Sequence, residues 1–128
     1  MARYRRVRRL AAGDEVWLWS VRHAHRAGPD GRCREVLSLH RTGPKEARAV
    51  MRLVFAAGPD RFVAEGFWYS GSVSVGGGRL LNLHEPGVVR RLLEAARVRG
   101  WVSERGEVVV DGWPLFDVVV AAAGDGEG

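Results

Sequence analysis

The chain has 128 residues, a length typical of one domain, and 46% of them are hydrophobic, which is enough for a core. Its longest uninterrupted apolar run, residues 118–123, is far shorter than the roughly 20 residues of a membrane-spanning helix, and no apolar segment follows the basic N-terminus as in an export signal. With Cys33 as its one cysteine it cannot form an internal disulfide, so the sequence predicts a cytoplasmic protein with no membrane partner.

The positive charge is concentrated at the N-terminus. The formal net charge is +5, and five arginines without any acidic residue lie within residues 1–10, which leaves the rest of the chain neutral. The arginines of this predicted basic arm are Arg3, Arg5, Arg6, Arg8 and Arg9. Clustered guanidinium groups attract nucleic-acid phosphates and other polyanions, although a charge run can equally be a solvated end. Lys45 is the only lysine, a bias typical of a high-GC coding sequence.

The first third of the chain predicts three antiparallel strands. Segments 6–10 and 15–26 have strand composition and flank a turn at Gly13 and Asp14. A second turn, with proline, aspartate and glycine in a row, leads into the alternating segment 33–41. This order of strands and turns predicts an antiparallel meander.

The central region combines strand signals with one ambiguous segment. Residues 44–57 place apolar side chains at both helical and strand spacing, so the pattern leaves helix and strand open. Residues 61–83 predict strands, with Gly66 and Gly71 at a bulge or bend and the glycines of residues 76–78 in a hairpin loop. A phosphate-binding glycine loop would lead into a helix instead, and none is predicted there.

The last third predicts one helix and one hairpin. Pro86 suits a first helical position, and an apolar stripe follows it, so the main helix is expected near residues 86–99. Residues 106–120 predict a hairpin that turns at Asp111-Gly112. Its second strand contains Pro114, which lacks an amide donor, and is therefore expected at a sheet edge.

Together these segments predict an α+β fold. We expect a mostly antiparallel sheet of six to eight strands with one main helix near residues 86–99. Residues 1–120 are predicted to form a single globular domain, and the small polar residues 121–128 a disordered tail. The order lacks the strand–helix alternation of a doubly wound nucleotide-binding fold.

Several segments carry a family resemblance. Residues 82–101, "NLHEPGVVRRLLEAARVRGW", together with "WSVRHAH", "CREV" and "SGSVSV" upstream, resemble a group of short uncharacterised actinobacterial proteins. The resemblance extends over most of residues 5–120. It implies a small α+β domain in which residues 49–56 are a strand, and it transfers no catalytic residue because the group has no established activity.

The segment "WLWSVRHAH", residues 17–25, contains a candidate metal site. In an extended strand every second side chain points to the same face, which here would carry Trp17, Trp19, His23 and His25. The two imidazoles would stand about 6.6 Å apart along the strand, close enough to share a zinc ion. Three side chains on the next predicted strand could complete such a site: Cys33, Glu35 and His40.

The same histidines have two other interpretations. The spacing H-x-H-x7-C matches no diagnostic zinc motif, so His23 and His25 could simply end the tryptophan-bearing face at the rim of the sheet. A general base is the remaining interpretation, because histidine titrates near neutral pH. A base needs a nucleophile beside it, and Ser70 and Ser72 do not form a nucleophile elbow. No catalytic residue is therefore predicted.

A run of three aromatic residues offers a candidate stacking surface. Phe67, Trp68 and Tyr69 are consecutive, so on a strand at least one of them faces the core, and Trp68 and Tyr69 are the candidates for a nucleic-acid platform. The tandem aromatic pattern of an RRM is missing.

Three functional hypotheses follow from the sequence. The first is a cytoplasmic binding module that holds nucleic acid or another polyanion through its N-terminal arginines. The second is a protein–protein interaction or accessory domain in which the arm only aids solubility. The third is a metal-binding protein that uses His23 and His25, with zinc as the only cofactor considered.

Overall fold

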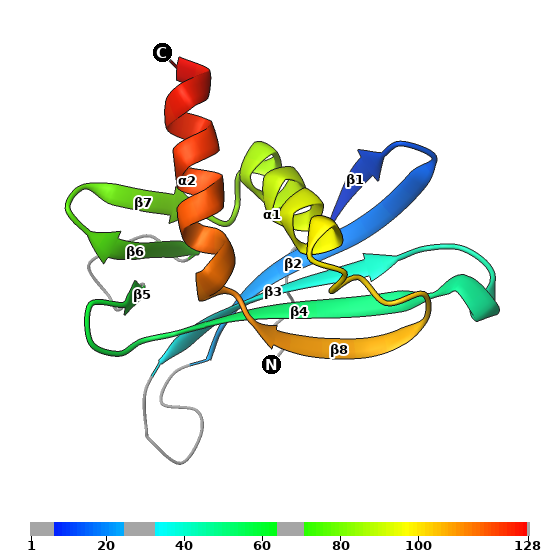
Figure 1. Cartoon of the computed structure of the whole chain (residues 1–128). Coiled ribbons are helices and arrows are strands. Elements are labelled where there is room, and N and C mark those ends of the chain that lie inside the picture. Colours follow the sequence, from blue (N-terminus) through cyan, green and yellow to red (C-terminus); the bar gives the residue numbers. More distant parts are fainter. Residues whose placement is uncertain (1–6, 25–32, 64–70, 128) are drawn as a thin grey trace.

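The described residues form eight strands and two α-helices, which confirms the predicted sheet-dominated α+β class (Figure 1). The computed structural model describes residues 7–24, 33–63 and 71–127, with side chains described up to residue 121. A short 3-10 helix, η1, joins β3 to β4. In chain order the elements are β1 (Arg8–Ala12), β2 (Glu15–Ala24), β3 (Arg34–Arg41), η1 (Lys45–Ala47), β4 (Ala49–Ala56), β5 (Phe62–Val63), β6 (Ser72–Gly76), β7 (Arg79–Asn82), α1 (Pro86–Val98), β8 (Gly106–Asp111) and α2 (Trp113–Glu127).

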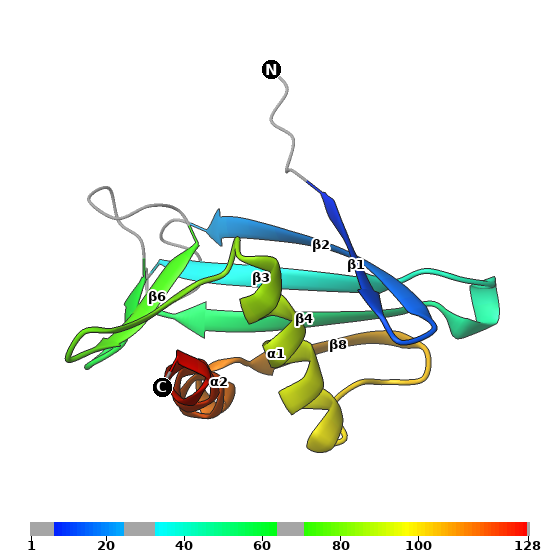
Figure 2. The ribbon, with the colours of Figure 1, turned by 90° about the horizontal axis from the view of Figure 1, so that it is seen from above.

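The strands form two sheets rather than one. The larger sheet has the order β1-β2-β3-β4-β8, in which β1 to β3 are the antiparallel meander that the sequence predicts. Strand β4 continues it antiparallel to β3, and β8 runs parallel to β4. Most of the ambiguous segment 44–57 is a strand: β4 pairs with both β3 and β8, and only η1 before it is helical. The smaller sheet, β5-β6-β7, is antiparallel and lies at one end of the larger one. Both helices lie on the same side of the larger sheet, and α1 crosses its strands (Figure 2).

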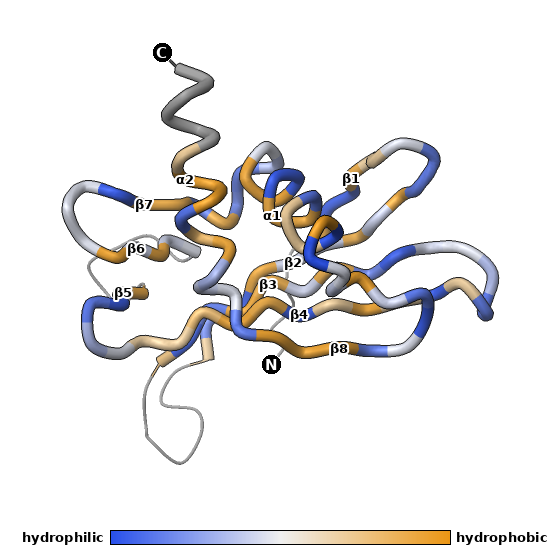
Figure 3. The backbone as a smooth tube through the Cα atoms, in the orientation of Figure 1, coloured by the Kyte–Doolittle hydropathy of each residue, from blue (hydrophilic) through white to orange (hydrophobic). Residues whose placement is uncertain are grey.

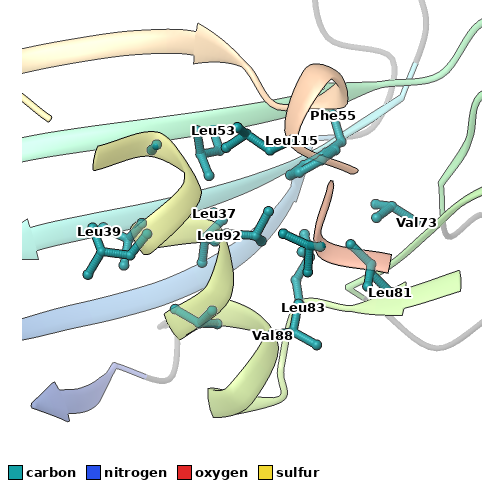
Figure 4. Packing of buried hydrophobic residues seen from close by; sticks show 14 of the residues in the cluster. Leu37, Leu39, Leu53, Phe55, Val73, Leu81, Leu83, Val88, Leu92 and Leu115 are labelled. Atoms are coloured by element: carbon teal, nitrogen blue, oxygen red, sulfur yellow. The ribbon is translucent and has the colours of Figure 1, made fainter. Parts of the chain in front are cut away.

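The core lies between the larger sheet and the two helices (Figure 4). Alternation along the strands sends every second side chain into it, and the helices add their apolar stripes. The tryptophans of "WLWSVRHAH" belong to this core, since both are almost completely buried. The largest fully buried side chains are Trp17, Trp19, Phe55, Phe116, Leu37, Leu39, Met51, Leu53, Leu83, Leu92, Leu93 and Leu115.

Helix α1 forms where the sequence predicts a helix. Glu85 precedes it in an extended conformation, and Pro86 occupies its first turn, where no amide donor is needed. Hydrophobic and hydrophilic positions alternate along its turns (Figure 3). One side of the helix is buried through Val88, Val89, Leu92, Leu93 and Ala96. Arg97 on its exposed side bonds Glu15 at 2.5 Å, which ties α1 to the start of β2.

The predicted strand over residues 113–120 is wrong, because these residues begin the second helix, α2. Pro114 lies in its first turn, and the Asp111 carboxylate accepts a hydrogen bond from the Trp113 amide at 3.1 Å. The buried positions Trp113, Phe116 and Val119 are three residues apart, which is helical spacing. The backbone of α2 continues to Glu127, so the disorder predicted for residues 121–128 is not seen through residue 127.

Gly112, at the junction of β8 and α2, is required by close packing. A Cβ atom at this position would lie 2.5 Å from Phe55 Cζ, well inside van der Waals contact. We expect Gly112→Ala to lower the free energy of unfolding by about 1–3 kcal/mol, the usual effect of overpacking a core. Urea denaturation measures this. Gly87→Ala in α1 is the matched control, since its Cβ meets open space and it should be neutral or slightly stabilising.

Among the helices of the described ranges, none has the length and apolar character required to cross a membrane.

Candidate functional site

The two faces of the larger sheet have different surroundings. The face that carries Trp17, Trp19 and His23 lies under the helices, and its tryptophans are buried. His23 is half-buried at the end of that face. This confirms the interpretation of the histidine as a rim residue of the tryptophan-bearing face, and it places both tryptophans in the core rather than on a binding surface.

His23 has a buried partner on the neighbouring strand. It lies opposite Glu35 in the β2–β3 register, and a hydrogen bond joins His23 Nδ1 and Glu35 Oε2. Glu35 is 0% exposed, and its other oxygen accepts a hydrogen bond from the Gly71 amide at 3.2 Å. Burial raises the pKa of the Glu35 carboxyl, because these two hydrogen bonds only partly offset the loss of water around the charged form. The pair therefore links β2, β3 and the start of β6.

The contacts around this pair are close-packed. A Cβ on Gly71 would lie 2.5 Å from His84 Cδ2, so the imidazole ring packs directly on the glycine. Arg8 donates to the His84 carbonyl at 2.8 Å, and its guanidinium carbon lies 5.0 Å from the centre of the Trp19 ring. Arg8, predicted as a nucleic-acid contact, is thus engaged with the protein itself.

The titration of Glu35 should be visible in protein stability. Because its pKa is raised in the folded protein, the folded state binds that proton more tightly than the unfolded chain. The wild type should lose stability relative to Glu35→Gln as pH rises from the ordinary carboxyl range through the raised pKa, by up to about 1.4 kcal/mol for each pH unit in that window. Urea denaturation across this pH range measures the difference. Glu94→Gln, on the exposed side of α1, is the control, and a pH-independent difference for Glu35→Gln would contradict the assignment.

The zinc hypothesis has little support within the described ranges. They contain no group of three or more His, Cys, Asp or Glu side chains that could hold a metal ion. Cys33, directly before β3, is buried in the hydrophobic core, and His40 lies on the face of β3 opposite Glu35. His25 lies outside the described residues. The zinc site thus stays a prediction.

The opposite face of the larger sheet, here called the open face, has no described helix on it (Figure 1). Strand alternation places one arginine from each of the first four strands on this face. The residues are Arg9 from β1, Arg22 from β2, Arg34 from β3 and Arg52 from β4. Arg9 and Arg22 are exposed, and Arg34 and Arg52 are half-buried. Since neighbouring strands lie about 4.8 Å apart, the basic positions extend over about 14 Å across the sheet.

A hollow of about 310 Å³ lies on the open face. Its lining combines Val7, just before β1, and Leu18 of β2 with polar groups from β2, β3 and β4. The lining residues are Val7, Leu18, Trp19, Ser20, His40 and Arg52. Beside it a second hollow of about 330 Å³ shares Leu18 and His40 and includes Arg48. The open face is therefore indented as well as basic.

The predicted site residues divide into two groups. Arg8 and Arg9 belong to β1, so the predicted basic arm of residues 1–10 overlaps the first strand. The positions that lie outside the described residues are Arg3, Arg5, Arg6, His25, Trp68 and Tyr69. The sequence analysis did not single out Arg22, Arg34 or Arg52, although strand alternation alone would have placed them opposite the core face.

Comparison of the chain with protein-family models, with curated proteins and with solved structures finds no match. The resemblance to short actinobacterial proteins thus stays a prediction.

Proposed function

We propose that this protein binds nucleic acid through its phosphate backbone, using the open face of the larger sheet together with Arg3, Arg5 and Arg6 that precede it in the sequence. The observation that carries the proposal is the presence of one arginine from each of β1, β2, β3 and β4 on the face without a described helix. Guanidinium groups bind phosphate oxygens through paired hydrogen bonds. A face that presents several guanidinium groups attracts a polyanion.

The composition of the open face favours binding without base recognition. Along its described strand positions the face carries no Phe, Trp or Tyr, so it offers no ring on which a base could stack. Arginine contacts to phosphate position a nucleic acid but carry no sequence information. We therefore expect similar affinities for oligonucleotides of equal length and different sequence.

The test compares two charge-matched variants in fluorescence anisotropy with a labelled oligonucleotide. One variant replaces Arg9, Arg22 and Arg34 by Gln, and the control replaces Arg79 of the smaller sheet, Arg91 of α1 and Arg99 at the end of α1. We expect the open-face variant to bind at least roughly 10-fold more weakly and to lose about one unit of salt dependence per arginine. The control loses the same net charge and should bind within about threefold of the wild type. Equal weakening of both variants would contradict the proposal.

A protein partner is the second candidate, favoured by a different surface. The outer side of the smaller sheet has a hollow of about 290 Å³ beside Phe62 and Leu80, which are 44% and 50% exposed. An apolar side chain of a partner would fit there. Binding at this hollow would be lost on Leu80→Asp and would depend little on salt, whereas nucleic-acid binding through the open face would persist.

A further inference from the structure

The 310 Å³ hollow on the open face contains a serine that the fold itself does not use. Ser20 is 7% exposed and lines the hollow, yet its hydroxyl forms no hydrogen bond with the described residues. Its hydroxyl oxygen is not fully enclosed by protein atoms and stays accessible from the hollow. By contrast, the hydroxyl of Ser38, its cross-strand neighbour, accepts a hydrogen bond from Arg52 at 2.7 Å. Ser20 thus has a donor available to a ligand in the hollow.

Arg52 is held in position at the edge of the same hollow. Its Nη1 donates to Ser38, and its Nε donates to Glu107 at 2.8 Å. Its Nη2 forms no hydrogen bond within the described part of the chain. Two bonds fix the orientation of the planar guanidinium group, which lowers the entropy lost when a third contact forms.

The hollow has a polar side and an apolar side, which suit a phosphate group and the sugar attached to it. His40 and Arg52 stand on the β3 and β4 side, and Leu18 and Val7 provide apolar surface on the other. The volume is at the lower limit of small-ligand sites, which begin near 300 Å³. One negative group faces the site, because the Glu107 carboxylate is bonded to Arg52 and is half exposed.

We propose that this hollow is the phosphate subsite of the open face, and that Ser20, His40 and Arg52 together hold one phosphodiester group of the bound strand. This inference rests on the proposed function. Ser20 donates a hydrogen bond to a phosphate oxygen, and Arg52 contributes charge and its Nη2 donor. Glu107 opposes the phosphate, so it limits the affinity of the subsite.

The experiment measures oligonucleotide affinity for three single variants by fluorescence anisotropy at low salt. Ser20→Ala removes the donor and should weaken binding roughly 10-fold, as expected for a hydrogen bond to a charged group. Ser20→Thr keeps the hydroxyl and should remain within about threefold of the wild type. Glu107→Gln removes the opposing charge, so binding should tighten by roughly threefold or more.

Failure of the subsite can be distinguished from failure of the proposed function. If Ser20→Ala and Glu107→Gln leave the affinity unchanged while the open-face arginine variant still weakens it, the subsite is wrong and the proposed function stands. If the wild type binds no oligonucleotide, the proposed function fails. Inorganic phosphate, titrated while NMR follows the Ser20 amide and the Arg52 side chain, then gives a separate result, and absence of shifts at both overturns the subsite.

Discussion

Replacement of Trp19 by alanine is expected to lower the free energy of unfolding by about 3–5 kcal/mol, the range for removing a large aromatic side chain from a core. Trp19 is 1% exposed and belongs to the core between the larger sheet and the helices. Urea denaturation followed by circular dichroism measures the loss. A cost below about 1 kcal/mol would mean that the tryptophan-bearing face is a surface.

Phenylalanine substitutions separate packing from hydrogen bonding at the two buried tryptophans. The Trp17 indole donates to Glu15 at 3.1 Å, whereas the buried Trp19 indole nitrogen has no partner among the described residues. We expect Trp19→Phe to cost less than Trp17→Phe, because only the latter breaks a hydrogen bond. The reverse order would contradict the assigned contacts.

The affinity for nucleic acid is expected to fall roughly 100-fold or more between about 50 mM and about 200 mM salt. The reason is counterion release, since each phosphate neutralised by an arginine adds to the slope of log affinity against log salt. Four open-face arginines alone give a slope near −3.6 for duplex DNA by the usual coefficient of about 0.9 per contact. An anisotropy series at several salt concentrations measures it, and a flat response would contradict a phosphate-binding face.

The second helix shows where sequence patterns can favour the wrong element. The dipeptide Asp111-Gly112 is typical of a hairpin turn, and the valines of residues 118–120 have high strand propensity. Tertiary packing decides otherwise. Gly112 is needed for its close approach to Phe55, and the buried residues that follow have helical spacing. The helical spacing of the apolar residues and the position of Pro114 are both visible in the sequence. The direction that the chain takes after β8 is set by packing against the core, which no local pattern shows.

Strand alternation predicted the core face of the larger sheet better than charge density predicted the site. It correctly placed Trp17, Trp19 and His23 on one face of β2, with Glu35 beside His23 on the neighbouring strand. The charge run drew attention to the N-terminus, although Arg8 turns out to contact Trp19 and the His84 carbonyl. Arginines spaced far apart in sequence came to share one face of the sheet only through the strand order β1-β2-β3-β4.

The buried His23–Glu35 pair could be predicted only in part. The sequence named both residues as potential neighbours across the second turn. It could not reveal that the Gly71 amide bonds the same carboxylate, because this contact spans 36 residues and joins the two sheets. Contacts of this kind depend on how separate sheets pack and leave no local pattern in the chain.

The most direct test of a division between a core face and a phosphate-binding face is an NMR map of the full chain titrated with an oligonucleotide. We expect shifts at open-face positions of β1 to β4, including the Arg22, Arg34 and Arg52 side chains, with little change in α1 and α2. Shifts centred on the helices or on the smaller sheet, with the open face unchanged, would contradict it.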